Sequence, residues 1–432
     1  MAAAWTVAIG LSLLSILWVE LVRDSYHTLA HYWTPLYRLH VWHHKVFRPD
    51  LTVVDPTVYR RAQWYNDVPE ASVMLLCGGL WGWWVQPWLS VGHWLPFLGC
   101  AYTLIFLGGA IARGLAVPKA DTFTDLTHLP GPFTEPPSTL FVNRTYHWRH
   151  HFDSQTAYFC GTFSFLDKLM GTALSLKGKT VAVTGAAGGL GQALIIELQR
   201  AGATPIALTS GSRPLPASFT DLGVRVLRWQ VGQEAAIADE LQRIDILLLN
   251  HGVNVLRDRC ATAIEQSYEV NAFSQWRLLE LFLETVTDNR AIARKEVWVN
   301  TSEAEVNPAF SPLYELSKRA IGHLITLRRL DSPIVLRKLI LGPFRSDLNP
   351  YGVMSARWVA RQVVALAKRD VRNIIVTINP LTYLFFPLKE ASTSWYYRLF
   401  SRPTRSSRSL TFTDSSEKIH TVGNQTEQNS LR

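Results

Sequence analysis

The sequence is poor in cysteine and in charged residues. Four cysteines occur in 432 residues, at Cys77, Cys100, Cys160 and Cys260, and no two of them form a CxxC pair. This spacing argues against a disulfide framework or a cysteine-based zinc site, and it indicates a reducing compartment. Charged residues make up only 18% of the chain while aromatic residues reach 11%, which excludes a disordered chain and favours a membrane protein.

The sequence also lacks a concentrated basic stripe, although its net charge is +9. Residues 1–175 hold eleven Lys and Arg against eleven Asp and Glu, and the remainder holds 32 against 23. Because the basic residues are interspersed with acidic ones, nucleic acid is not an expected partner. The length exceeds that of a single core, so we predict a membrane domain over 1–175, a second domain over 176–400 and a disordered polar tail over 401–432.

Three apolar runs, at 5–22, 71–89 and 94–112, predict an α-helical membrane domain with three crossings. No basic residue precedes the first run, so we expect a retained anchor and not a cleaved signal peptide. The other two runs form a hairpin. Six Lys and Arg lie in 23–70 and none lies in the hairpin turn, which predicts an N-terminus outside and both catalytic modules on the cytoplasmic side.

Histidines cluster in the expected cytoplasmic segments as HxxxH and HxxHH patterns. On a helix, residues at i, i+3 and i+4 share one face, so each pattern directs its imidazoles toward a common point. This number of ligands exceeds the four that one tetrahedral zinc takes, which favours two ions of iron, copper or zinc. His93 is excluded because it lies in the hairpin turn. The predicted metal ligands are His27, His31, His40, His43, His44, His128, His147, His150 and His151.

The order of these boxes around a hydrophobic hairpin, followed by YFCGTFSFLDKLMGT with Asp167 and Thr172, resembles the fatty acid hydroxylase/sterol desaturase superfamily over about residues 10–173. The resemblance implies a membrane-embedded oxygenase with cytoplasmic His-box helices, in which two Fe ions activate O2 against a lipid C–H bond. Thr28 stands where the superfamily often has Arg. The chain has no electron-transfer motif, so an external electron donor such as ferredoxin or a cytochrome is implied.

After Leu176 the pattern changes to a buried strand, a glycine-rich turn and a helix. Further strand-like runs at 244–249, 296–300, 334–341 and 373–378 predict an α/β, Rossmann-type doubly wound parallel sheet. The turn reads Thr184-Gly185-x-x-x-Gly189-x-Gly191, and such glycines let the backbone approach a pyrophosphate at the helix N-terminus.

Tyr314 and Lys318 share one face of a predicted helix. We expect the ammonium to lower the pKa of the phenol, which then exchanges a proton with a carbinol or carbonyl oxygen. With the glycine motif, the set resembles the short-chain dehydrogenase/reductase family over about 177–380. The resemblance implies that Ser302 orients the substrate oxygen, Lys318 holds the nicotinamide ribose and Asn271 supports a proton-relay water. The expected cofactor contacts are Thr184, Gly185, Gly189, Leu190, Gly191, Asn250, Gly252, Tyr314 and Lys318.

The second strand ends in PIALTSGSR, without an acidic residue for a ribose 2′-hydroxyl. Ser210 and Arg213 could instead take a 2′-phosphate, which favours NADP(H) over NAD(H). Gln230 replaces the family's usual adenine-contacting Asp, and Leu341 replaces its usual Pro.

These features predict a bifunctional membrane lipid oxidoreductase. The iron module would hydroxylate or desaturate a lipid of the bilayer, and the reductase would interconvert an alcohol and a carbonyl, with tethering that raises the effective concentration of an intermediate. Two alternatives stay open: an active reductase beside a non-iron histidine site, and a non-catalytic NADP(H)-binding scaffold or sensor. The apolar segment 379–402 fits either a substrate lid or a patch at the membrane interface.

Overall fold

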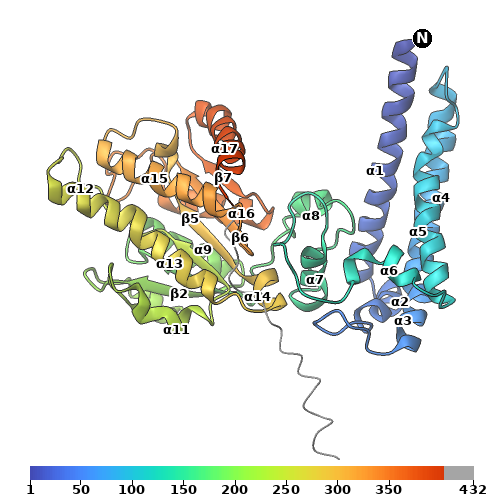
Figure 1. Cartoon of the computed structure of the whole chain (residues 1–432), viewed down its shortest axis with the longest axis horizontal. Helices are drawn as coiled ribbons and strands as arrows, with labels where there is room; N and C mark the ends of the chain where they lie inside the picture. The colour runs from blue at the N-terminus through green and yellow to red at the C-terminus, as the bar shows by residue number, and fades with distance from the viewer. Residues whose placement is uncertain (403–432) are drawn as a thin grey trace, which may run out of the picture.

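The computed structural model describes residues 1–402, which form a helical part and an α/β part (Figure 1). The tail expected over 401–432 lies outside the described residues from position 403 onward. The helices of the first part are α1 (Ala2–Tyr32), α2 (Thr34–His44), α3 (Pro56–Ala62), α4 (Val68–Val85), α5 (Leu98–Gly114), α6 (Ala120–Thr124), α7 (Arg144–Phe152) and α8 (Phe165–Met170).

The expected hydrophobic hairpin is present as α4 and α5, which lie beside α1 (Figure 1). Packing is close, because a Cβ at Gly78 of α4 would lie 2.9 Å from Cγ1 of Val19. Two segments, Ala2–Tyr32 and Leu95–Gly114, are long and apolar enough to cross a membrane. The three predicted crossings are therefore not confirmed, since Glu70 and several Trp and Gly residues lower the mean hydropathy of α4.

The apolar surface of α1 ends at a cluster of buried charges. Arg23 donates to Glu20 at 2.6 Å and to the Thr162 hydroxyl at 2.8 Å, and the backbone N–H of Gly161 donates to Asp24 at 3.0 Å. These bonds hold the segment that leads into α8 at the level where the apolar part of α1 ends.

The α/β part confirms the predicted doubly wound parallel sheet. All seven strands are parallel, in the order β3-β2-β1-β4-β5-β6-β7. The strands are β1 (Thr180–Thr184), β2 (Thr204–Thr209), β3 (Arg225–Arg228), β4 (Ile246–Leu249), β5 (Glu296–Asn300), β6 (Val335–Leu341) and β7 (Asn373–Val376). The central strands are buried on both faces, which explains their continuous runs of Val, Ile and Leu.

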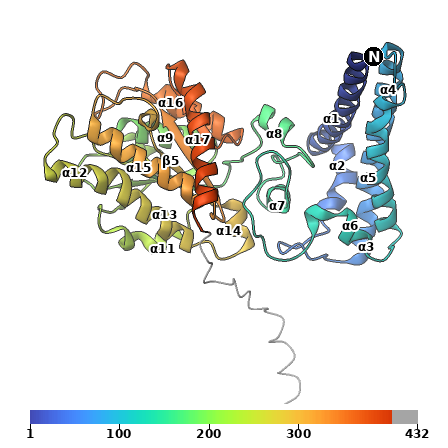
Figure 2. The same cartoon turned by 45° about the horizontal axis from the view of Figure 1, so that its top comes forward.

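Helices cover both faces of the sheet (Figure 2). Leu194 of α9 and Val363 of α16 pack on one face, while Phe282 of α13 and Ile325 of α15 pack on the other. The helices of this part are α9 (Gly189–Arg200), α10 (Ser218–Asp221), α11 (Ala238–Leu241), α12 (Ala261–Tyr268), α13 (Ser274–Glu284), α14 (Asn289–Arg294), α15 (Pro312–Arg328), α16 (Ala356–Lys368) and α17 (Pro380–Phe400).

Buried ion pairs join the two parts at the amino ends of the strands. Arg149 of α7 lies 3.1 Å from Glu296, the first residue of β5, and both side chains are fully buried. Glu296 also pairs with Arg337 at 2.9 Å, and Arg337 pairs with Asp370 at 2.7 Å. The helix that carries the last histidine box is thus fixed to the sheet.

We predict that Glu296→Gln lowers the free energy of unfolding by about 3–5 kcal/mol, because it leaves two buried guanidinium groups without their shared carboxylate. Urea titration of the detergent-solubilised protein measures the loss. The matched control is Glu240→Gln, which removes a partly exposed pair with Arg225 and should cost less than about 1 kcal/mol. Equal losses in the two variants would contradict the role given to Glu296.

Candidate metal centre and dinucleotide site

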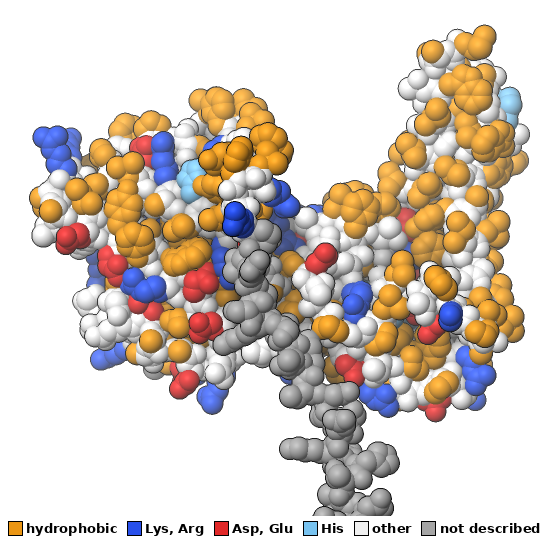
Figure 3. Space-filling model, in the orientation of Figure 1, with side chains coloured by type: hydrophobic (Ala, Val, Ile, Leu, Met, Phe, Trp, Pro, Cys, Tyr) orange, Lys and Arg blue, Asp and Glu red, His pale blue; other side chains and the backbone are white. Residues whose placement is uncertain are grey.

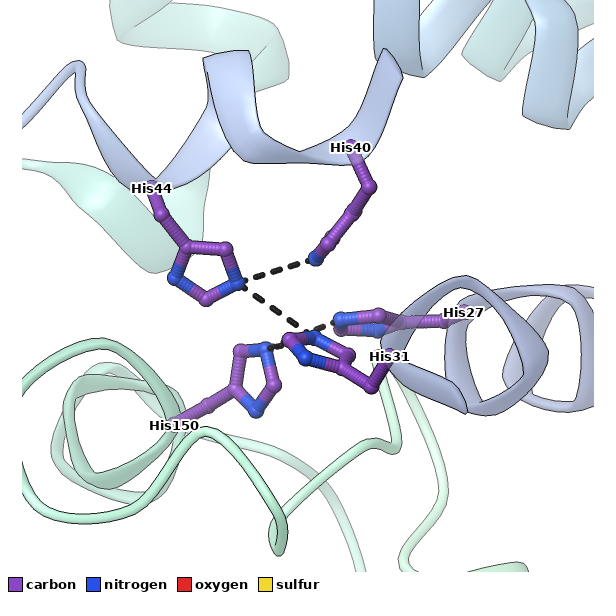
Figure 4. A group of neighbouring side chains, drawn as sticks. All are labelled: His27, His31, His40, His44 and His150. Carbon is purple, nitrogen blue, oxygen red and sulfur yellow. Dashed lines mark hydrogen bonds between the residues drawn. The ribbon is translucent and has the colours of Figure 1, made fainter. Parts of the chain in front are cut away.

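The structure brings all nine predicted metal ligands together, in two groups. Within each group the ligand atoms lie within 4.8 Å of one another. The first group, drawn in Figure 4, comprises His27, His31, His40, His44 and His150, and the second comprises His43, His128, His147 and His151. The histidine boxes on α1, α2 and α7 therefore each contribute to a shared site, with His128 supplied by the turn Leu126–His128.

Hydrogen bonds to the outer ring nitrogens orient several of these imidazoles. Nδ1 of His40 donates to Oδ1 of Asn66 at 2.7 Å, and Nδ1 of His150 donates to the carbonyl of Ala157 at 2.9 Å. The Nε2 atoms of these two rings then carry lone pairs, which point at the Nε2 atoms of His44 and His27 at 2.9 Å. Lone pairs that converge at this separation need a proton or a cation between them, so the donor set fits a metal ion.

Burial favours the neutral form of four of these imidazoles, those of His40, His43, His147 and His151. Desolvation, together with the neighbouring rings, holds the pKa of His43, His147 and His151 well below the ordinary value. Burial also lowers the pKa of His40 to about 4. Neutral imidazole is the form that ligates iron, copper and zinc.

Two supporting residues were not anticipated from the sequence. Asp125 accepts from Nδ1 of His128 at 2.5 Å, and its position three residues before that histidine was an available signal. Asn66, which orients His40, lies in the π-helical turn Gln63–Asp67 and has no comparable signature. Such turns often occur at functional sites.

Asp167 of the LDKLMGT segment holds α7 in place through hydrogen bonds. Its carboxylate accepts from the backbone N–H groups of Phe159 and Cys160, from the Tyr146 hydroxyl at 2.9 Å and from Thr172 at 2.7 Å. Tyr146 lies on α7, so this motif positions the last histidine box without contacting its imidazoles.

The glycine-rich turn between β1 and α9 fits a pyrophosphate. Gly185 adopts φ +65°, and a Cβ at Gly191 would overlap the carbonyl oxygen of Gly185. A Cβ at Gly189 would meet nothing within 4 Å, and Leu190 is buried beneath the turn. Because α9 has no side-chain cap, its first N–H groups are available to a phosphate.

Thr184 has a different role from the one expected. It is fully buried, and its hydroxyl accepts from the backbone N–H of Asn250 and contacts Nδ1 of His251, each at 2.8 Å. It therefore joins the ends of β1 and β4 and does not face a ligand. Buried polar atoms without a partner among the described residues include Nε2 of His251 and Oδ1 of Asn300, which suits a polar ligand here.

The expected catalytic residues lie at the carboxyl ends of the strands. Ser302 follows β5 and hydrogen-bonds Tyr314 of α15, and Lys318 Nζ donates to the carbonyl of Asn300 at 2.8 Å. Asn271 lies in a second π-helical turn, Glu269–Phe273, and donates to the carbonyl of Val253 at 2.9 Å. A Cβ at Gly252 would lie 3.0 Å from Oδ1 of Asn271, so the amide closes against this glycine.

The electrostatics of Tyr314 differ from the expectation. Burial raises the pKa of its phenol, and the hydrogen bond from Ser302 opposes this rise. Burial also lowers the pKa of Lys318 to about 7, and its ammonium lies 5.9 Å from the centre of the tyrosine ring. Burial and the hydrogen bond from Ser302 therefore govern the pKa of the phenol, and the predicted lowering by Lys318 is not seen.

Ser210 and Arg213 both lie after β2 and are exposed. The Ser210 hydroxyl lies 2.9 Å from that of Ser212, and Arg213 pairs with Asp347. These contacts are at the surface, so their replacement by contacts to a 2′-phosphate costs little free energy.

Residues 179–332 match the family model of short chain dehydrogenases. Over 411 residues the chain is 60% identical to a monoglucosyldiacylglycerol epimerase from Synechocystis sp., a match that covers 93% of this chain and 100% of that protein. The chain belongs to the monoglucosyldiacylglycerol epimerase family. It is accordingly an enzyme with a short-chain dehydrogenase domain in its second half.

Solved structures similar to this epimerase-family chain include a short chain dehydrogenase from Burkholderia cenocepacia in complex with NADP. It is 19% identical with a TM-score of 0.43, and the match covers 53% of this chain and 100% of that one. An alcohol dehydrogenase from Thermococcus sibiricus complexed with 5-hydroxy-NADP is also 19% identical, with a TM-score of 0.40 and coverage of 47% and 96%.

We predict that the purified protein binds two metal ions per chain, one in each histidine group. His150→Ala should remove the ion of the first group and His151→Ala that of the second, because each ring faces several ligands of its own group. Elemental analysis by mass spectrometry gives the stoichiometry. The control His93→Ala changes an exposed histidine in the hairpin turn and should keep both ions. A single ion in the unmodified protein would refute the two-centre interpretation.

Proposed function

We propose that this chain epimerises the sugar headgroup of a glycosyl diacylglycerol. The observation that carries the proposal is the Ser302–Tyr314 pair beside the glycine-rich turn, in a chain 60% identical to the Synechocystis epimerase over nearly its whole length. Inversion of one carbinol carbon requires loss of its hydrogen as hydride and of the hydroxyl proton, followed by return of the hydride to the opposite face of the carbonyl carbon and of the proton to its oxygen. The net reaction is an isomerisation.

The side chains divide this work. Ser302 orients the sugar oxygen, and Tyr314 takes the hydroxyl proton and later returns it. Lys318 would hold the nicotinamide ribose and Asn271 would support a proton-relay water, and their hydrogen bonds to the carbonyls of Asn300 and Val253 hold both side chains in place. For inversion, the sugar must present the opposite face of its carbonyl carbon to the hydride donor before the return step, while its oxygen stays within reach of Tyr314.

A nicotinamide dinucleotide, when bound, supplies acceptance and return of the hydride. The turn at Gly185, Gly189 and Gly191 would hold its pyrophosphate, next to Leu190, Asn250 and Gly252. Ser210 and Arg213 follow β2, which has no acidic residue at its end, and this supports NADP(H) over NAD(H).

Two loops near the carboxyl ends of β5 and β6 support a lipid substrate. Phe310 precedes the helix of Tyr314 and is 100% exposed, and Tyr351 in the loop after β6 is 92% exposed. Large exposed aromatic side chains near the polar residues Ser302 and Tyr314 suit a molecule with a sugar head and acyl chains.

The histidine groups support a second function on a lipid. We propose that they hold two Fe ions, as the resemblance to the fatty acid hydroxylase/sterol desaturase superfamily implies, and that O2-dependent hydroxylation or desaturation occurs there. The observation in favour is the convergence of nine imidazoles, eight from the three histidine boxes and the ninth from His128. An external electron donor such as ferredoxin or a cytochrome belongs to this proposal. Zinc without iron in the native protein would refute it.

We further propose that the N-terminus lies outside and that the histidine groups and the reductase domain lie on the cytoplasmic side. Six Lys and Arg in residues 23–70, against none in the turn between α4 and α5, support this orientation.

Tyr314→Phe should reduce epimerisation of a glucosyl diacylglycerol in vesicles by about a hundred- to ten-thousand-fold, because one oxygen handles the substrate proton. Dinucleotide binding and metal content should stay nearly unchanged, since other residues provide them. Product is measured by chromatography of the lipids with a substoichiometric amount of NADP.

The control for this experiment is Tyr32→Phe, a change at a 64% exposed tyrosine of α1 in the helical part, which should keep full epimerase activity. Full epimerisation by Tyr314→Phe would disprove the assignment. Conversion that consumes one dinucleotide per lipid would show a simple dehydrogenase instead.

A reporter domain inserted next to Gly92 tests the orientation. A reporter that works only after export should be active at this position. The reason is that the turn between α4 and α5 carries no Lys or Arg and is therefore expected outside. A second reporter fused after Arg402 should read as cytoplasmic. A cytoplasmic signal from the Gly92 position would overturn the proposed topology.

A further inference from the structure

Helix α17 separates its charged and apolar residues onto opposite faces. Lys389 pairs with Glu305 at 2.6 Å, and Glu390 pairs with Lys338 at 2.8 Å, so both charges at the centre of the helix face the protein. The outward face is apolar and aromatic, with side chains between 47% and 74% exposed at Leu381, Leu384, Phe385, Leu388, Trp395 and Phe400. Arg398, in the last turn, is an exposed charge of this helix.

A second apolar surface lies on α8, where Phe165, Leu169 and Met170 are 53%, 77% and 44% exposed. The hydrogen bonds from the Gly161 N–H to Asp24 and from Arg23 to the Thr162 hydroxyl hold the segment before α8 at the charged end of the apolar part of α1. This level is where the candidate membrane span would leave a bilayer.

The two surfaces face the same way. In Figure 1, α17 and α8 lie on the side toward which the N-terminal half of α1 extends. Figure 3, in the same orientation, shows hydrophobic side chains along this upper edge, over α17 and over the middle of the molecule where α8 lies. A single membrane surface can therefore contact both helices while α1 crosses it.

We infer that α17 rests in the interface of the same bilayer that α1 crosses, and that the α/β domain is held against the membrane by this helix. An interfacial helix buries an apolar face rich in Trp, Phe and Leu and keeps its charged face away from the acyl chains, as α17 does. Trp395 suits the headgroup level, and Arg398 suits anionic headgroups.

The contact bears on the catalytic site. Thr377, Asn379 and Thr382, at the start of α17, donate to Glu303 at 2.6 to 3.0 Å, and Glu303 follows Ser302 directly. A bilayer beneath α17 would thus place the Ser302 side of the site at the lipid surface, where a glycolipid presents its sugar without leaving the membrane. This consequence rests on the proposed function, whereas the bilayer contact does not.

Photocrosslinking of the full chain in vesicles tests the contact. The vesicles contain phosphatidylcholine and phosphatidylglycerol with an alkyne on one acyl chain, and p-benzoylphenylalanine replaces Leu388 in one variant and Val226 in the other. Val226 is 42% exposed on β3, at the opposite edge of the sheet from β7. We expect a lipid adduct yield about tenfold higher at position 388 than at position 226.

A third variant carries the probe at Leu169 of α8, where a lipid adduct is also expected. Equal lipid yields at 388 and 226 would overturn the inference, as would adducts at 388 with a second copy of the chain or with residues 403–432. The measurement uses no glycolipid and no dinucleotide. A lipid adduct at 388 together with failed epimerisation would therefore reject the proposed function and retain the bilayer contact.

Discussion

The buried ion pair between Arg149 and Glu296 is the constraint on which both parts of the molecule depend. On α7, His147 and His151 point to one histidine group and His150 to the other, while Arg149 points away from both toward β5. A guanidinium without water or a carboxylate is costly, so α7 takes this orientation only against the sheet. The α/β domain thereby sets the geometry of imidazoles that belong to the helical part.

Local pattern was enough to find the eight histidines of the three boxes and the parallel strands, because each rests on periodicity within a few residues. It could not assign the histidines to groups of five and four. Neighbours such as His150 and His151 enter different groups, and this division depends on how α1, α2 and α7 pack. Asn66 was missed for the same reason, since it approaches His40 only through the fold.

At the reductase site, too, local sequence pattern predicted only part of the structure. Glycines at 185 and 191 were predictable, because the turn needs a positive φ and close backbone contact that other residues do not allow. The inward hydroxyl of Thr184 and the low pKa of Lys318 were not, because both follow from burial that the linear sequence does not display. The crossing predicted over 71–89 was expected from the length of an apolar run, but Glu70 and the tryptophans of α4 lower the mean hydropathy of this helix.

The two sites lie at opposite ends of the sheet. The histidine groups adjoin the amino ends of the strands through Arg149, and Tyr314 lies at the carboxyl ends, so the length of β5, on the order of 20 Å, separates them. A lipid that reacts at both sites would have to dissociate from the first site and then bind to the second. Lateral diffusion would then govern the transfer, and the intermediate would be open to capture by other membrane enzymes.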